Sequence, residues 1–484
     1  MDALLWDGNA TQAARMGERI SAAARPAAMA RLALLQNGDA TPITAENPLM
    51  ADAGLAYLAA RKLYRGSNIS LAAKILANRP QLSAPPLEPR KWVGLLLAVA
   101  RDAGPSDAVA VAERIDDGFA PRADISQTSF ALRDDYTSLM WLGGTAALWN
   151  LRDPARAAPL FYRYGMAGRT PQTRAKGFYW AGRALAQSGQ SAPAVTYFES
   201  AAAYPDQFYG MLALERLGRP LPSFADPAHA MPSAEDRRAF LARPLSQAVR
   251  ELAKNGDWPT TIRFFREISA DAKGEIDKVL VAELARNLGR RDLGVVLGTA
   301  AQNDGVSNFR EVAFPLIPTP PGADWTIIHA ITRQESQFSQ NAVSHSGARG
   351  LMQVMPAVGA ERARKLGLAP NTAALTSDAG FNMQLGDALY GHLMDLYGGS
   401  YPLAIAAYNA GQGNVGKWLR NMGDPRSSGQ DWVEWIERLP FTETRGYVTH
   451  VIENAVVFEA MHPEYASYKG SNPASHFLGK KQPG

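Results

Sequence analysis

Helical periodicity fills the first part of the chain. From Met1 to about residue 220, alanine-rich stretches with apolar residues on one helical face alternate with short polar turns. This pattern predicts helices in antiparallel pairs. A loose unit recurs at Trp141 and again at Trp180, where an aromatic residue and small residues end one helix and an alanine pair begins the next. Such spacing is typical of helical repeat arrays. We predict an α-superhelical repeat arm over 1–220, although packing alone would also explain its tryptophans.

The composition changes near residue 220, where proline, aspartate and serine become frequent over 219–232. A run of this kind indicates a domain boundary. Helical periodicity then resumes, and we assign 221–312 to a second helical domain in which we find no chemistry. Prolines 315, 318, 320 and 321 exclude a helix there and begin a third domain, 313–462. The remaining tail, 463–484, is expected to be mobile or loosely docked.

A candidate acid follows the first helical stretch of the third domain. Apolar residues at 325, 327, 328 and 331 fit one face of a helix, and Glu335 lies one turn beyond Ile331 on that face. A carboxyl group at the end of a buried stripe is half removed from water, which raises its pKa and favours general acid catalysis. A helix-terminal glutamate in solvent is the alternative interpretation.

A loop follows this helix. Gly350 suggests a positive φ or a close approach of the backbone. Gln353 stands among apolar residues, so its amide either satisfies the loop backbone or points at a ligand. Pro356 is suited to the first turn of the next helix, where its missing N–H costs nothing. The loop therefore predicts a shaped wall close to Glu335.

Five motifs in this order resemble the soluble lytic transglycosylases, whose catalytic domain is similar to goose-type lysozyme. The motifs lie within about 320–460, and they are Glu335-Ser336, Gly350-Leu-Met-Gln-Val-Met-Pro356, Asn382 with Gly386 and Tyr390, Ala407-Tyr-Asn-Ala-Gly411, and Glu443-Thr-Arg445 with Tyr447. The resemblance implies an all-α chain with a superhelical arm, a helical linker domain at 221–312 and a lysozyme-like catalytic domain at 313–462.

The resemblance also implies roles for individual residues. Glu335 would be the catalytic acid and base. Residues expected to hydrogen-bond the sugar are Ser344, Gln353 and Asn409. Residues expected to form the wall of the cleft are Met355, Tyr390 and Tyr408. Glu443 would align the substrate, or Tyr447 and Arg445.

The expected reaction is cleavage of peptidoglycan between N-acetylmuramic acid and N-acetylglucosamine, with a 1,6-anhydro product. Glycoside cleavage usually needs two carboxylates, but one is sufficient when the sugar's 2-acetamido group assists. Two alternatives remain open. A hydrolase of the goose-lysozyme type would use the same acid with water, and a non-catalytic helical scaffold would only bind glycan.

Composition limits the partners and the location. The net charge is +4, and the chain contains no cysteine and no apolar run of membrane-spanning length. No metal or other cofactor is expected, and a compact basic run typical of nucleic-acid binding is missing. Peptidoglycan strands are the expected partner, together with other cell-wall enzymes. The resemblance implies a periplasmic enzyme, and we expect that an export signal was removed, since residues 1–7 do not resemble one.

Overall fold

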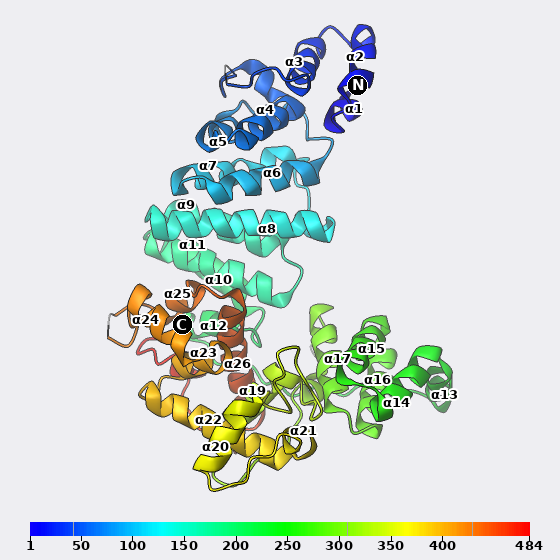
Figure 1. Cartoon of the computed structure of the whole chain (residues 1–484), viewed down its shortest axis with the longest axis vertical. Coiled ribbons are helices and arrows are strands. Elements are labelled where there is room, and N and C mark those ends of the chain that lie inside the picture. Colours follow the sequence, from blue (N-terminus) through cyan, green and yellow to red (C-terminus); the bar gives the residue numbers. More distant parts are fainter. Residues whose placement is uncertain (42, 307, 428) are drawn as a thin grey trace. The chain divides into compact units, whose positions relative to one another are not determined.

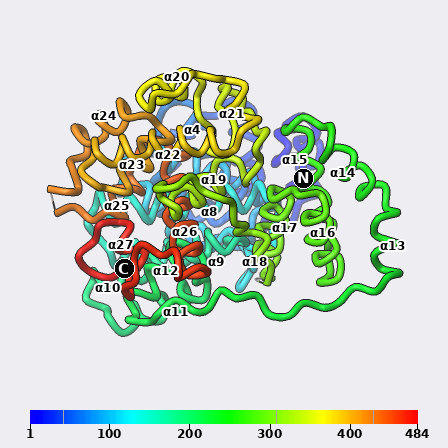
Figure 2. Tube along the Cα trace, turned by 90° about the horizontal axis from the view of Figure 1, so that it is seen from below, coloured from blue at the N-terminus to red at the C-terminus, as the bar shows by residue number. Residues whose placement is uncertain are grey.

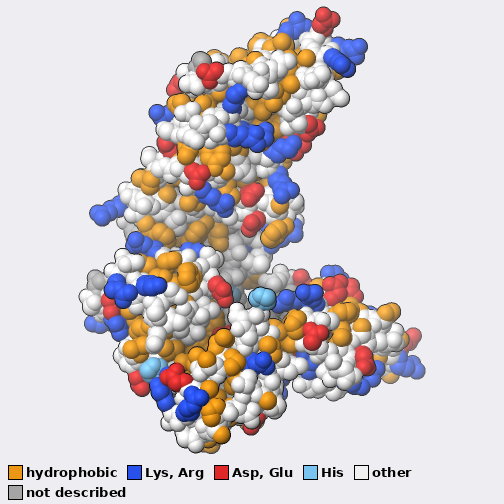
Figure 3. All heavy atoms as spheres, viewed as in Figure 1, with side chains coloured by type: hydrophobic (Ala, Val, Ile, Leu, Met, Phe, Trp, Pro, Cys, Tyr) orange, Lys and Arg blue, Asp and Glu red, His pale blue; other side chains and the backbone are white. Residues whose placement is uncertain are grey.

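The computed structural model describes residues 1–41, 43–306, 308–427 and 429–484. It divides into two compact units, Met1–Tyr204 and Pro205–Gly484. Regular structure in these described ranges is helical, apart from two isolated β-bridges. No helix among them is long and apolar enough to cross a membrane. On the face shown in Figure 3, basic and acidic side chains are interspersed over the surface of each unit.

The first unit is a stack of helices in which each helix packs on helices one or two positions away in the sequence. Helix α8 packs on α9, α9 on α10 and α10 on α11, and Figure 1 shows these helices as successive layers. This arrangement is typical of helical repeat proteins. The helices are α1 (Asp2–Trp6), α2 (Ala10–Arg15), α3 (Arg25–Leu35), α4 (Ala53–Arg65), α5 (Ile69–Asn78), α6 (Pro89–Asp102), α7 (Pro105–Glu113), α8 (Phe130–Thr145), α9 (Pro154–Ala167), α10 (Pro171–Gln187) and α11 (Ser191–Ala202). Short helical turns are η1 (Gly17–Arg19), η2 (Pro48–Ala51), η3 (Ile115–Gly118), η4 (Ile125–Gln127) and the π-helical η5 (Ala146–Asn150).

Small residues bring neighbouring helices of this unit together, as the sequence predicted. A Cβ on Gly177 of α10 would overlap the backbone of Gly165 on α9. Trp180 is fully buried and packs edge-on against Trp141 and Trp149, with ring centroids 6.3 Å and 5.8 Å away. Packing accounts for these tryptophans.

The second unit begins with α12, continues through a group of helices with its own core, and ends with the helices that carry the candidate acid. Buried Phe240, Phe265 and Leu297 belong to the core of α13–α17. Figure 2 shows the extended segment that leads from α12 to α13. The helices are α12 (Phe208–Arg216), α13 (Ala234–Ala242), α14 (Pro244–Asn255), α15 (Trp258–Asp271), α16 (Glu275–Asn287), α17 (Arg291–Asn303), α18 (Arg310–Ala313), α19 (Trp325–Ser336), α20 (Pro356–Lys365), α21 (Ala374–Ser377), α22 (Ala379–Leu396), α23 (Tyr401–Ala410), α24 (Gln412–Met422), α25 (Trp432–Glu437), α26 (Thr442–Met461) and α27 (Pro473–Phe477).

Helix α12 belongs to the second unit, although the sequence placed it in the arm. It packs on α26 and α27. The backbone N–H of Phe208 donates to Glu453 Oε2 at 2.8 Å, and the Tyr209 hydroxyl donates to Glu437. These partners lie more than 200 positions away in the sequence, so local periodicity gives no sign of them. The division into arm, linker, catalytic domain and tail remains a prediction.

The C-terminal segment is docked, which differs from the mobile or loosely docked tail that we expected. Phe477 and Leu478 are buried. The carboxylate of Glu215 on α12 accepts the N–H groups of Ala474 at 2.8 Å and Ser475 at 3.2 Å, which satisfies the first turn of α27. Composition alone suggested mobility because the anchoring carboxylate lies far away in the sequence.

Candidate active site

Glu335 lies in the last turn of α19. Asp324 caps the start of the helix, since its carboxylate accepts the N–H of Ile327 at 3.0 Å, and the helix ends where Gln337 takes a left-handed conformation with φ 54°. Ile331 is fully buried one turn before Glu335. The adjacent Ser336 hydroxyl donates to the Leu351 carbonyl at 2.7 Å, which ties the end of the helix to the loop beside it.

Burial dominates the electrostatics of Glu335. It raises the pKa of this carboxyl group from 4.5 to about 7, and the nearby charge of Glu443 acts in the same direction. The Tyr447 hydroxyl donates to Glu335 Oε1 at 2.7 Å and opposes the rise, because this hydrogen bond favours the carboxylate. The predicted half-buried carboxyl group with a raised pKa is confirmed. With a pKa near neutral pH, such a group can both give and take a proton.

The loop after α19 is fixed by Gly350 and Asn382. Gly350 has φ 75°, and a Cβ there would overlap the Leu375 carbonyl and the Asn382 amide. The buried Asn382 side chain accepts the N–H of Met352 at 2.8 Å and donates to the carbonyls of Arg349 and Leu375, both at 2.9 Å. The positive φ and the close approach predicted for Gly350 are therefore both present.

Gln353 serves the loop backbone and also lies at the cavity. Its amide nitrogen donates to the carbonyls of Gly350 at 2.8 Å and Ala342 at 3.2 Å. Ser344 closes the neighbouring turn, because its hydroxyl accepts the N–H of Ala348 at 3.0 Å. These contacts hold the loop in a shape that leaves both side chains on the cavity wall.

Helices α23 and α26 supply the facing side of the site. The Tyr408 hydroxyl donates to the Met352 carbonyl at 2.8 Å. Asn409 accepts from the Thr444 hydroxyl at 2.7 Å, while its amide nitrogen lies 3.5 Å from Glu443 Oε1. The pKa of Tyr408 is raised well above its ordinary value by burial. Tyr408 is therefore a neutral hydrogen-bond donor that braces the loop.

These side chains surround a cavity of about 850 Å³, a size typical of ligand sites. Seven of the ten predicted residues line it, namely Glu335, Ser344, Gln353, Met355, Tyr408, Asn409 and Glu443. The other three are not among the residues that line it. Tyr390 is 3% exposed. Tyr447 is buried and donates a hydrogen bond to Glu335. Arg445 donates to the Glu437 carbonyl at 3.2 Å and to the Thr442 hydroxyl at 2.7 Å.

Sequence reasoning missed a charged part of this wall. Glu361, Arg362 and Lys365 of α20 line the cavity, together with His392 of α22. The available signal was their helical spacing after Pro356, because positions 358, 361, 362 and 365 share one face of a helix. That face looked like an exposed surface in the sequence because it carries three charges.

Another buried glutamate illustrates why a raised pKa alone does not identify the acid. Burial raises the pKa of Glu453 on α26 to about 8. Its carboxylate, however, accepts the backbone N–H of Phe208 and is not part of the cavity lining. Glu453 therefore supports the packing of α12, whereas Glu335 combines a raised pKa with access to a ligand.

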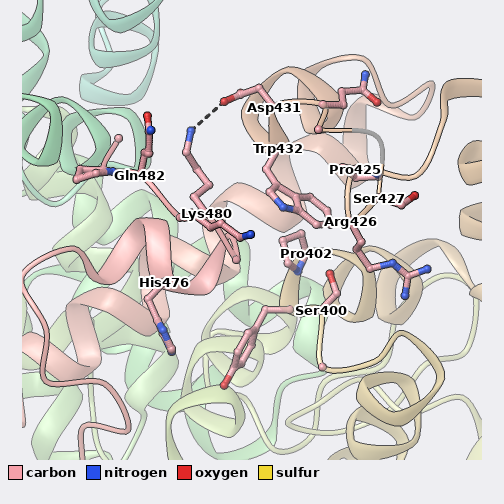
Figure 4. Close-up of a pocket in the computed structure, with 18 of the residues that line it drawn as sticks. Ser400, Pro402, Pro425, Arg426, Ser427, Asp431, Trp432, His476, Lys480 and Gln482 are labelled. Carbon is pink, nitrogen blue, oxygen red and sulfur yellow. Dashed lines mark hydrogen bonds and ion pairs between the residues drawn. The ribbon is translucent and has the colours of Figure 1, made fainter.

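A larger cavity, of about 1030 Å³, lies near the start of α23. Figure 4 shows Lys480 reaching toward Asp431 across it, with Nζ and Oδ2 2.9 Å apart. Arg426, also on its wall, is paired with Asp424 at 2.6 Å. These charges are satisfied within the protein, and Glu335 is not among the residues that line this space. The smaller cavity is therefore the candidate active site.

The fold and this site define an all-α protein with a half-buried carboxyl group on the wall of a cavity, and the comparisons with known proteins are as follows. Residues 319–429 match the transglycosylase SLT domain family. A soluble lytic murein transglycosylase of Salmonella typhimurium is 26% identical over 321 residues, which cover 63% of this chain and 44% of that protein. Its Escherichia coli K12 counterpart is 28% identical over 291 residues, 57% of this chain and 42% of that protein. The matched region thus spans less than half the length of these relatives.

Solved structures agree on the fold. The 70-kDa soluble lytic transglycosylase of Escherichia coli superposes with a TM-score of 0.52 at 21% identity, covering 99% of this chain and 71% of that one. A lytic transglycosylase of Pseudomonas aeruginosa gives 0.54 at 22% identity, covering 93% and 70%. The predicted all-α fold is confirmed. The resemblance is confirmed as well: the chain is similar in sequence to the soluble lytic murein transglycosylases, and residues 319–429 match the transglycosylase SLT domain family.

Proposed function

We propose that this protein is a lytic transglycosylase that cleaves the β-1,4 bond between N-acetylmuramic acid and N-acetylglucosamine in peptidoglycan. The observation that carries this proposal is Glu335, a half-buried carboxyl group with a pKa of about 7 on the wall of a cavity large enough for sugar units. The homologues are named soluble lytic murein transglycosylases. We further propose that the protein works in the periplasm, where its peptidoglycan substrate lies.

The reaction needs one group that first gives and then takes a proton. Protonated Glu335 donates to the glycosidic oxygen as the bond from that oxygen to C1 of the muramic acid breaks. The 2-acetamido group of the same sugar stabilises C1. The Glu335 carboxylate then removes the proton of the C6 hydroxyl while the C6 oxygen bonds to C1. The acid is restored, a 1,6-anhydro ring forms, and no water is consumed.

The other acidic residues of the cavity are less suited to this exchange. Glu361 is ion-paired with Lys365 at 2.9 Å and Arg362 at 2.8 Å, and such partners keep a carboxylate ionised. Glu443 is exposed in the first turn of α26, so it lacks the burial that raises the pKa of Glu335. In our proposal Glu443 raises the pKa of Glu335 and aligns the substrate with Asn409.

The remaining residues shape the site in this proposal. Ser344, Gln353 and Asn409 hydrogen-bond the sugar and its acetamido group, while Met355 and Tyr408 form the wall of the cleft. Tyr447 orients the acid. Tyr390 and Arg445 support the site without contacting the sugar, since neither lines the cavity. For Tyr390 this replaces the direct substrate contact expected from the sequence.

Product analysis tests the proposed reaction. An internal hydroxyl held beside C1 can reach an effective concentration of about 10⁵–10⁸ M in well-oriented cases, so it should outcompete water. We expect purified sacculi to release muropeptides with 1,6-anhydro ends, and digestion in ¹⁸O-water should leave these ends unlabelled in mass spectra. Label at C1 in most of the product would identify a goose-lysozyme-type hydrolase instead. Absence of turnover would favour a non-catalytic scaffold.

The hydrogen bond from Tyr447 makes a prediction about pH. Because this bond lowers the pKa of Glu335, Tyr447→Phe should raise that pKa above about 7. The proton needed for the first step would then persist to higher pH, so the alkaline fall in kcat/KM should move upward by roughly one pH unit. The measurement is a pH profile of muropeptide release.

Tyr136→Phe is the matched control for this substitution. Tyr136 in the first unit is also buried and donates to a carboxylate, Asp116 Oδ1, at 3.0 Å. Its substitution should leave the pH profile in place. A Tyr447→Phe profile that falls at the same pH as the wild type would contradict the role given to Glu335.

A further inference from the structure

Helix α20 presents a charged face to the candidate active site. Val358, Glu361, Arg362 and Lys365 all line the cavity, and their spacing places them on the stripe that is ordinarily apolar when a helix faces inward. Figure 3 shows basic, acidic and histidine side chains gathered over α20 and α22. We call the cavity-lining residues Glu361, Arg362 and Lys365 the α20 wall.

Arg362 is the buried member of the α20 wall. Only 7% of the residue is exposed. Its Nη2 donates to Glu361 Oε1 at 2.8 Å, but Nε is buried without a hydrogen-bond partner among the described residues. A buried donor left unsatisfied costs free energy, most of all on a charged group. A ligand atom that accepts from Nε of this guanidinium would remove that cost.

The existing partner of Arg362 can yield to a ligand. The Glu361 side chain is 52% exposed and also pairs with Lys365, which is itself 57% exposed. Ion pairs in solvent contribute little to stability, so Glu361 can turn outward while Arg362 and Lys365 stay. The wall would then offer two positive charges toward the cavity, and the guanidinium geometry suits a carboxylate held by two hydrogen bonds.

We propose that the α20 wall binds a carboxylate on the side arm of the muramic acid, with Arg362 as the main specificity-determining residue. This inference rests on the proposed function. The neutral sugar rings would lie against Glu335, Tyr408 and Asn409, while the acidic arm lies against α20. The carboxylate has two possible sources: the stem peptide of an intact strand, or the free lactyl group of a strand without peptide.

Binding to a catalytically silent protein tests this proposal. In the Glu335→Gln background, Kd should be measured for three oligosaccharides of equal length: one with stem peptides, one with free lactyl groups, and chitotetraose, which carries no carboxylate. Adding Arg362→Gln should weaken the carboxylate-bearing ligands about tenfold or more and change chitotetraose less than twofold. Weakening confined to the first ligand assigns a carboxylate of the stem peptide. Weakening confined to the second ligand assigns the free lactyl carboxylate, which is consumed in the amide bond when a stem peptide is attached. Weakening of both means that the wall accepts a carboxylate from either source.

Matched variants separate recognition from folding. Arg364→Gln removes the same charge from an exposed position of α20 that does not line the cavity, and it should leave all three Kd values unchanged. Arg362→Lys should recover part of the loss. Lys365→Gln, at an exposed site where misfolding is not expected, should weaken the carboxylate-bearing ligands about two- to threefold.

Two results would overturn the proposal. One is equal weakening of all three ligands by Arg362→Gln, which would mean a purely structural role. The other is no effect on the carboxylate-bearing ligands. If the wild-type protein releases anhydro-muropeptides but Arg362→Gln leaves the Kd values unchanged, only the role of the α20 wall is rejected. If the wild-type protein shows no turnover, the proposed function itself is rejected.

Discussion

Replacing Glu335 by glutamine should reduce peptidoglycan cleavage by about 10³-fold or more. General acid–base catalysis contributes roughly 10²–10⁴-fold, and here one residue serves both proton transfers. The amide keeps the shape of the side chain, and its oxygen can still accept from Tyr447. Fold and glycan binding should therefore persist. Cleavage is measured as the release of soluble muropeptides from sacculi. Glycan binding is measured separately as the Kd for a non-cleaved oligosaccharide.

The matched control is Glu453→Gln. Glu453 is another glutamate whose pKa is raised by burial, but it does not line the cavity, and the glutamine amide can still accept the N–H of Phe208. We expect activity close to that of the wild type. Retention of even a tenth of wild-type turnover in Glu335→Gln would assign the acid to another residue.

Thermal stability gives an independent measure of the same carboxyl group. The folded protein holds the Glu335 proton up to a pKa of about 7, whereas an unfolded glutamate ionises near 4.5. As pH rises from 4.5 through 7, this group therefore destabilises the folded state increasingly. Glutamine removes the effect, so Glu335→Gln should have a Tm at pH 8 equal to or above that of the wild type, with a smaller difference at pH 4.

Gly350→Ala should lower the free energy of unfolding of the catalytic region by about 3 kcal/mol. An alanine at φ 75° costs about 1–2 kcal/mol, and the overlap of its Cβ with Leu375 and Asn382 costs about 1–3 kcal/mol more. Displacement of the loop would also disturb Gln353 and Met355, so activity should fall with stability. Chemical denaturation and muropeptide release measure the two effects.

Gly347→Ala provides the comparison for this substitution. Gly347 has φ 87°, and a Cβ there meets no atom within 4 Å. Only the cost of the left-handed backbone conformation applies, so we expect the free energy of unfolding to fall by about 1–2 kcal/mol. Equal losses for the two variants would mean that the contact of Gly350 with Asn382 contributes nothing to the loop.

Local patterns were sufficient for the helices and for the position of the acid. Apolar periodicity over 325–331 placed Glu335 at the end of a buried stripe, and the glycine at 350 signalled a special backbone conformation. Both follow from chemistry within one or two helical turns. The order of the motifs then indicated a resemblance to the soluble lytic transglycosylases, and residues 319–429 match the transglycosylase SLT domain family.

Contacts between distant segments decided the rest. Tyr447, 112 positions from Glu335, sets part of its pKa, and Glu215 anchors a C-terminal segment about 260 positions away. The structure places Tyr390 outside the cavity lining, whereas the charged face of α20 is part of that lining. A sequence specifies which face of a helix is polar, but only tertiary packing determines whether that face meets water, a neighbouring helix or the space where a substrate would lie.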